Sequence, residues 1–194
     1  MTELLNSRIY DDAFFEKLSV SDNSLSGKEF SRCTFLNCNF TDAKLNDCDF
    51  IDCRFESCNL SNSKLRNTGL KDVSFVDCKL IGIDFSDCTD FLFVVRFEKC
   101  DISYASFHKK SLRKTAFIDC LIREADFTES NLSDARFLNC DLYQTVFEHT
   151  NLSGADFETA FNYSLNPELN VVRKARFSYP GVLGLLDRFG IKIV

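Results

Sequence analysis

The chain has 194 residues, of which 45% are hydrophobic and 27% charged, and its formal net charge is −6. This length suits one compact domain, and the apolar content is too high for a disordered chain. The acidic balance disfavours direct nucleic-acid binding through phosphates, and no apolar stretch is long enough to span a bilayer. The first residues carry neither the basic region nor the apolar core of a signal peptide, so we expect a cytoplasmic protein with reduced thiols.

Residues 1–27 carry a degenerate form of a pattern that becomes regular further along the chain. Large apolar residues stand five apart at Phe15, Val20 and Leu25, but the positions between them are less uniform than those that follow. The first unit of a stacked repeat needs a cover on its open side. We therefore expect this segment to form an N-terminal cap with degenerate repeats.

From residue 28 to residue 160, a large apolar residue recurs every five positions, and a small residue such as Cys33 or Ala43 stands two positions before most of them. A helix repeats about every 3.6 residues and a strand about every 2, so neither predicts this spacing. A chain that makes a short extended stretch, turns a corner and repeats does predict it. The skewed composition, with 21 Phe and 10 Cys against 1 Met and 0 Trp, agrees with a repeat.

Stacking the chain every 20 residues sorts these positions into columns, provided that two extra residues are accepted between positions 86 and 96. One column then holds only phenylalanine and a second holds mostly aliphatic residues with cysteine beneath them. Both sets are expected to line the core. They are Phe35, Phe55, Phe75, Phe97, Phe117, Phe137 and Phe157, and Cys38, Cys58, Cys78, Cys100, Cys120 and Cys140.

Segments such as 125–129 and 155–159, which read ADFTE and ADFET, resemble the A(D/N)LXX unit of the pentapeptide-repeat family. The resemblance covers about residues 28–160. It implies an all-β fold, a right-handed quadrilateral β-helix in which four pentapeptides make one square coil. Among the members of this family, the chain most resembles the fluoroquinolone-resistance type.

The two extra residues predict a bulge at a corner, within a stretch that contains Phe91-Leu-Phe-Val-Val95. These apolar side chains either form a contact patch or fold inward. Asp90 and Lys110 fall at the small inward position of one column on consecutive coils. Because an unpaired buried charge is costly, we expect them to pair with each other, or the corner to open there to water.

The regular spacing ends at Phe161, and residues 161–194 predict a loop from Asn162 to Asn170, a short helix from Pro180 to Phe189, and a final strand at Ile191 and Ile193. Pro suits the first helical position, and Gly190 suits the position after the end. This apolar ending either only closes the last coil or also joins two copies, and the resemblance to resistance-type proteins, which dimerise tail to tail, favours a homodimer. The residues concerned are Val182, Leu183, Leu185, Leu186, Phe189, Ile191 and Ile193.

No catalytic, cofactor or metal site is predicted. Every cysteine takes the small position of a repeat, and a spacing of five is not that of a zinc site. His108 and His149 fall at outward positions without a nucleophile as partner. The carboxylates also stand at outward positions, where a regular ladder offers one kind of environment rather than the two that an acid and a base need. They include Asp42, Asp47, Asp49, Asp52, Asp72, Asp77, Asp84 and Asp87.

Function must then depend on the outer surface, and two hypotheses stay open. The first is a non-catalytic scaffold for protein–protein interaction with an unknown partner. The second follows from the resemblance: resistance-type pentapeptide proteins mimic DNA and bind DNA gyrase or topoisomerase IV, which confers quinolone tolerance. The net charge suits mimicry, whereas a basic cluster opposes it. That cluster comprises Arg96, Lys99, Lys109, Lys110, Arg113 and Lys114.

Overall fold

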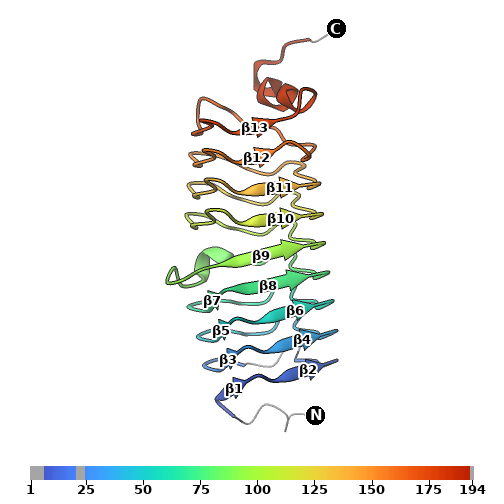
Figure 1. Cartoon of the computed structure of the whole chain (residues 1–194), viewed down its shortest axis with the longest axis vertical. Coiled ribbons are helices and arrows are strands. Elements are labelled where there is room, and N and C mark those ends of the chain that lie inside the picture. The colour runs from blue at the N-terminus through green and yellow to red at the C-terminus, as the bar shows by residue number, and fades with distance from the viewer. Residues whose placement is uncertain (1–6, 21–24, 193–194) are drawn as a thin grey trace.

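The computed structural model describes residues 7–20 and 25–192 and shows a rod of stacked coils with the two ends of the chain at opposite ends of the rod (Figure 1). Each coil makes short extended segments, turns corners and passes to the next layer. The expected right-handed quadrilateral β-helix is confirmed, and the described residues contain no α-helix.

Two parallel sheets run along the rod, one on each of two neighbouring faces of the coil. The other two faces are joined from coil to coil by isolated bridges, such as Asn39 to Asn59 and Lys44 to Lys64. The shorter sheet, here called face 1, consists of β1 (Ile9–Asp11), β3 (Glu29–Ser31), β5 (Asp49–Ile51) and β7 (Gly69–Lys71). The longer sheet, face 2, consists of β2 (Phe14–Glu16), β4 (Thr34–Leu36), β6 (Arg54–Glu56), β8 (Val73–Val76), β9 (Val95–Glu98), β10 (Ala116–Ile118), β11 (Arg136–Leu138), β12 (Asp156–Phe157) and β13 (Arg176–Phe177).

The register between neighbouring strands gives the length of each coil. Phe35 pairs with Phe55 and Phe55 with Phe75, a step of 20 residues. Phe75 then pairs with Phe97, a step of 22, and the 20-residue step resumes from Phe97 to Phe117. The two extra residues therefore lie where the sequence pattern slips, and the loop that contains them leaves the rod beside β9 (Figure 1).

The corners of the coil are formed by residues with a left-handed backbone, two positions after each large inward residue. The angle φ is 57° at Asp42, 58° at Asn62 and 58° at Asp134. Asp and Asn tolerate this region better than most residues because their short polar side chains form local hydrogen bonds. Gly82, with φ of 68°, takes the same corner position. The polar residues of the repeat thus make the turns, while the apolar residues fill the interior.

The interior of face 2 is a continuous stack of phenylalanine rings. The ring centroids of Phe35 and Phe55 lie 4.6 Å apart, and those of Phe117 and Phe137 lie 4.9 Å apart with nearly parallel planes. This spacing follows from the distance of ~4.8 Å between neighbouring strands. The seven expected phenylalanines and the six expected cysteines of the next face are each at most 2% exposed.

Stacking begins before residue 28. Tyr10 on β1 pairs with Phe30, and Phe15 on β2 pairs with Phe35, in the same 20-residue register. Val20 and Leu25 are buried as well. The described part of the segment therefore follows the regular plan of a coil, and residues 1–6 and 21–24 of the expected cap lie outside the described residues.

The C-terminal segment differs from its expected helix and strand. The coil continues to Phe177, which pairs with Phe157. Two 3₁₀ turns follow in place of a single helix, η3 (Gly181–Leu185) and η4 (Asp187–Phe189). A segment this short with two internal glycines lacks the propensity for an α-helix, so its contacts with the last coil decide its shape. Ile191 lies outside any strand, and Ile193 lies outside the described residues.

Candidate interaction surfaces

The interior holds thiols that pack among the large apolar side chains of the core. All ten cysteines are buried and free, and the Cys58 thiol donates to the carbonyl oxygen of Phe35 at 3.3 Å. Burial raises the pKa of the Cys53 thiol to about 12, so it stays protonated and unreactive at neutral pH. No group of three or more metal-binding side chains occurs in the described part of the chain. The cysteines act as small apolar fillers.

Lys110 is the one lysine buried among the described residues, at 3% exposure. Its ammonium group donates to Asp90 Oδ1 at 2.7 Å and to the carbonyl oxygen of Cys88, and it lies over the ring of Phe93. The expected pair between Lys110 and Asp90 is therefore present. Cys88 rather than Asp90 takes the small inward position of that column, because the two extra residues follow Cys88 and place the Asp90 side chain at 86% exposure.

The loop that contains the extra residues alternates between inward and outward side chains. Phe93 and Val95 are buried, whereas Phe91 is 70%, Leu92 60% and Val94 44% exposed. Phe93 and Val95 thus fold inward, whereas the other three residues form an exposed apolar patch. We call Phe91, Leu92 and Val94 the bulge patch.

The basic cluster does not form a belt around the rod. Lys110 points inward, Lys99 contacts Glu98 at 3.8 Å, and Lys109 contacts Glu129 at 3.6 Å. The remaining members gather at the corner between face 1 and face 2, where they meet a fourth cation that the sequence analysis did not include. They line a depression of about 260 Å³, here called the basic notch, with Val94, Val95, Arg96, Arg113, Lys114, Thr115, Ala116 and Arg136 around it.

None of the eight aspartates expected on the outside is buried. Asp141, which the sequence analysis did not single out, is buried at 2% exposure. Its carboxylate accepts hydrogen bonds from Asn162 at 2.9 Å and from Arg123 at 2.7 Å. Burial alone would raise the pKa of this carboxyl, but these bonds together hold the pKa below its ordinary value. Leu121 and Phe161 stand on either side of it in the same bridge column and are exposed.

His149 is exposed and His108 half-buried. The backbone N–H of His108 donates to Ser106 Oγ at 3.4 Å, but no hydrogen bond joins either imidazole to a side chain in the described part of the chain.

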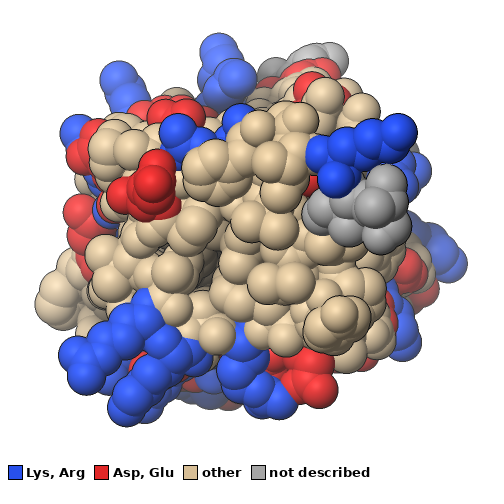
Figure 2. All heavy atoms as spheres, turned by 90° about the horizontal axis from the view of Figure 1, so that it is seen from above, with Lys and Arg blue, Asp and Glu red and all other residues tan. Residues whose placement is uncertain are grey.

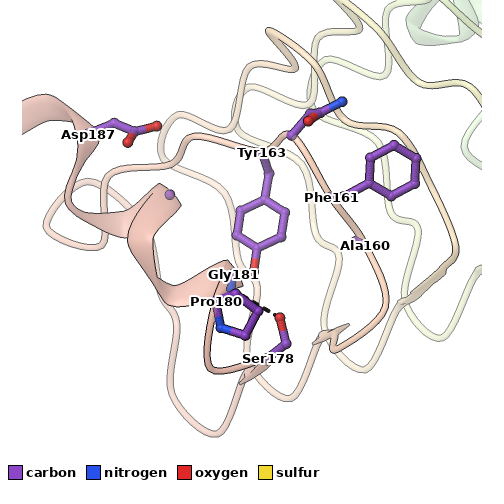
Figure 3. A pocket seen from close by; sticks show the side chains of 9 residues that line it. Ala160, Phe161, Tyr163, Ser178, Pro180, Gly181 and Asp187 are labelled. Carbon is purple, nitrogen blue, oxygen red and sulfur yellow. Dashed lines mark hydrogen bonds between the residues drawn. The ribbon is translucent and has the colours of Figure 1, made fainter. Parts of the chain in front are cut away.

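The C-terminal end closes the rod on one side and exposes apolar side chains on the other. A Cβ at Gly181 would lie 2.2 Å from the Tyr163 hydroxyl oxygen, and one at Gly184 would lie 2.2 Å from the Tyr163 carbonyl oxygen. The glycines of η3 therefore sit directly on Tyr163, beside a pocket of about 310 Å³ (Figure 3). Leu185 packs against the core, whereas Val182 is 39% and Leu183 43% exposed.

Seen from this end, the rod has charged side chains at its rim and a mostly uncharged middle (Figure 2). Phe189 and Ile191 add exposures of 51% and 55%. Of the residues expected to dimerise, the structure thus exposes Val182, Leu183, Phe189 and Ile191, and it leaves Leu185 and Leu186 half-buried. We call the four exposed residues the C-terminal patch.

Comparison with known proteins agrees with this architecture. The model of the pentapeptide repeat region matches residues 28–90 and 91–161. Two solved structures of QnrB1, a plasmid-mediated fluoroquinolone resistance protein, are similar in fold. A trypsin-treated variant has a TM-score of 0.63 and 21% identity over 96% of this chain and 91% of its own. The full-length form has a TM-score of 0.62 and 18% identity over 94% of this chain and 100% of its own. No curated protein sequence matches the chain.

No helix in the described part of the chain is long and apolar enough to cross a bilayer.

Proposed function

Because the chain belongs to the pentapeptide-repeat family, we propose that it is a non-catalytic scaffold that binds a protein partner through its outer surface. The observation that carries this proposal is the contrast between a filled interior and an exposed apolar loop. The core columns leave no interior site, whereas the bulge patch presents large apolar side chains to solvent on an otherwise regular rod. Exposed apolar groups of this kind are typical of protein contact sites.

The experiment for this proposal compares two double variants in partner capture. Phe91→Ser with Leu92→Ser removes the two most exposed apolar side chains of the bulge patch and leaves the core unchanged. We expect this variant to lose the partner that the wild-type chain retains. Phe14→Ser with Ile9→Ser is the matched control, because these residues are 62% and 60% exposed at the N-terminal end of the rod, away from the bulge beside β9 (Figure 1). Equal retention by both variants would contradict the role of the bulge.

We propose further that two copies associate through the C-terminal patch. Its residues are apolar, exposed and gathered at the end of the rod, where most charged side chains stand at the rim. Leu183→Glu together with Phe189→Glu should convert a dimer to a monomer in light scattering, since charge at an apolar contact is costly to bury. Ile9→Glu is the control that should leave the mass unchanged. A wild-type chain that is monomeric at high concentration would overturn this proposal.

A second candidate function is binding of DNA gyrase or topoisomerase IV as a DNA mimic. It is supported by the net charge of −6 and by fold similarity to QnrB1 along nearly the whole chain. The basic notch opposes it, because a DNA mimic needs a continuous negative surface. A supercoiling assay with and without quinolone decides between the two functions. Unchanged supercoiling and unchanged drug inhibition in excess protein would rule out the function as a DNA mimic.

The cytoplasm is the location we propose, because ten buried free thiols suit a reducing compartment.

A further inference from the structure

We propose that the basic notch binds a single phosphate group. The notch is built from three consecutive coils and contains four cationic side chains, those of Arg96, Arg113, Lys114 and Arg136. No carboxylate lines it. Arginine and lysine together provide the planar donors and the compact charge that recognise phosphate oxygens. This site adjoins the bulge patch, with which it shares Val94, and it is separate from the C-terminal patch. It does not depend on the partner proposed above.

The floor of the notch results from a small residue, Ala116, that stands between two arginines in one column. Along the outer edge of face 2, Ala116 pairs with Arg136, and Arg96 stands one coil below Ala116. The two arginines are therefore two strand spacings apart, roughly 9.6 Å between Cα atoms. The methyl group of Ala116 leaves the space between them open, which is wide enough for one phosphate to receive hydrogen bonds from both sides.

The charges in the notch are only partly neutralised by the protein itself. Arg96 is paired with Asp72, and Arg113 has Asp134 at 3.9 Å, which is a weak contact. Lys114 and Arg136 form no ion pair with any described residue. Four cations against two carboxylates leave the notch with an excess of positive charge on a chain whose net charge is −6.

The other arginines of the same column show that this excess is specific to the notch. Arg54 pairs with Glu56 at 3.0 Å, and Arg176 pairs with Asp156 at 3.1 Å. Asp156 is the register partner of Arg136, yet its second oxygen accepts from the backbone N–H of Glu158, so both oxygens are used away from Arg136. Each of the other arginines in this column therefore has a carboxylate partner, whereas Arg136 has none among the described residues.

The test is a titration with inorganic phosphate, followed by amide chemical shifts at constant ionic strength with chloride as the reference anion. We expect saturable shifts confined to the neighbourhood of Thr115 and Ala116. Arg136→Gln should weaken the affinity at least about tenfold, the effect of losing a charge-assisted hydrogen bond. Arg54→Gln is the matched control and should leave the affinity unchanged. Shifts that do not saturate, or that are equal in the two variants, would overturn the proposal.

A second variant tests the geometry of the notch independently. Ala116→Asp places a carboxylate between the two arginines, as Asp156 already does beside Arg176. We expect a higher melting temperature and no further rise when phosphate is added, whereas phosphate should raise the melting temperature of the wild-type chain. Retained phosphate binding in this variant would contradict the assigned site.

A parallel titration with phosphoserine shows whether the phosphate that the notch binds is free or esterified. Saturation by both means that the notch accepts free and esterified phosphate, and saturation by inorganic phosphate alone means that it accepts only the free ion. Either result supports the site, and saturation by neither refutes it.

Discussion

Face 2 and face 1 of the rod start from the same repeat and end with different properties. Face 2 keeps a strand in every coil and an unbroken stack of rings from Phe15 to Phe177. Face 1 loses its strands after β7, where the two extra residues enter, and continues only as isolated bridges such as Ser111 to Asn131. The regular face supplies packing, the interrupted face supplies the exposed apolar loop and the buried lysine, and the basic notch lies at the corner between the two faces.

The comparison shows how a repeat protein acquires a site. In a solenoid, each coil depends only on its neighbours, so an insertion disturbs one corner and leaves the ring stack of face 2 intact. Side chains at the disturbed corner are then exposed to solvent and available for binding. Substitutions on the two faces should therefore have unequal effects on stability.

The largest effect is expected in the ring stack. Phe117→Ala removes a ring that contacts the rings of Phe97 and Phe137 and is fully buried. It should lower the free energy of unfolding by about 3–5 kcal/mol in urea denaturation. Val94→Ala, on the bulge patch, should change it by less than about 0.5 kcal/mol. Similar losses for the two variants would mean that the faces are not energetically different.

A smaller effect is expected at the buried lysine. Asp90→Asn removes the negative charge that faces Lys110 and should cost about 1–2 kcal/mol, because the buried ammonium group then has only neutral acceptors. In a Lys110→Met background the same substitution should change the free energy of unfolding little, since the charge is gone. A double-mutant cycle measures the difference, and a coupling energy of zero would show that the pair does not stabilise the corner.

The ionised carboxylate of Asp141 should contribute about 1 kcal/mol to the free energy of unfolding, and this contribution depends on pH. Its folded-state pKa lies below the ordinary value of 3.8, so the ionised carboxylate stabilises the fold above about pH 4. That contribution is lost as the pH falls from the ordinary value toward the lower folded-state value. Asp141→Asn should therefore lower the melting temperature at pH 7 and have less effect at pH 3.

Asp126→Asn is the control for that measurement. Asp126 holds the equivalent place before a large inward residue and accepts from the N–H of Thr128, but no arginine contacts it among the described residues. Its substitution should show a weaker dependence on pH. A larger pH dependence for Asp126 than for Asp141 would contradict the role of Arg123.

The periodic part of the fold was predictable from sequence because each inward position is repeated many times. The 20-residue columns followed from the aligned phenylalanines and cysteines, and the two-residue slip followed from the 22-residue step between Phe75 and Phe97. The first coil was harder to recognise because Arg8 and Leu18 stand where small residues normally precede the large ones. The last coil was hidden because the loop around Pro167 separates Phe157 from Phe177.

The candidate sites were predictable only in part because they depend on side chains from different coils. Arg136 lies a full coil beyond Lys114 in the chain, and only the register places them together. Asp141 stands at a position that is usually exposed, and its burial results from Arg123 and Asn162 in the coils beside it. The 3₁₀ turns depend on Gly181 and Gly184 meeting Tyr163, which no local pattern indicates.

The accessibility of the thiols tests the central claim most directly, since the five-residue spacing must direct every cysteine inward. Alkylation with iodoacetamide, followed by mass spectrometry, gives the rate at each of the ten cysteines in the folded chain. We predict that no thiol is modified until the chain unfolds, because all ten are buried. Modification of Cys58, Cys78 or Cys100 in the folded chain at the rate of an exposed thiol would contradict the fold and the surfaces derived from it.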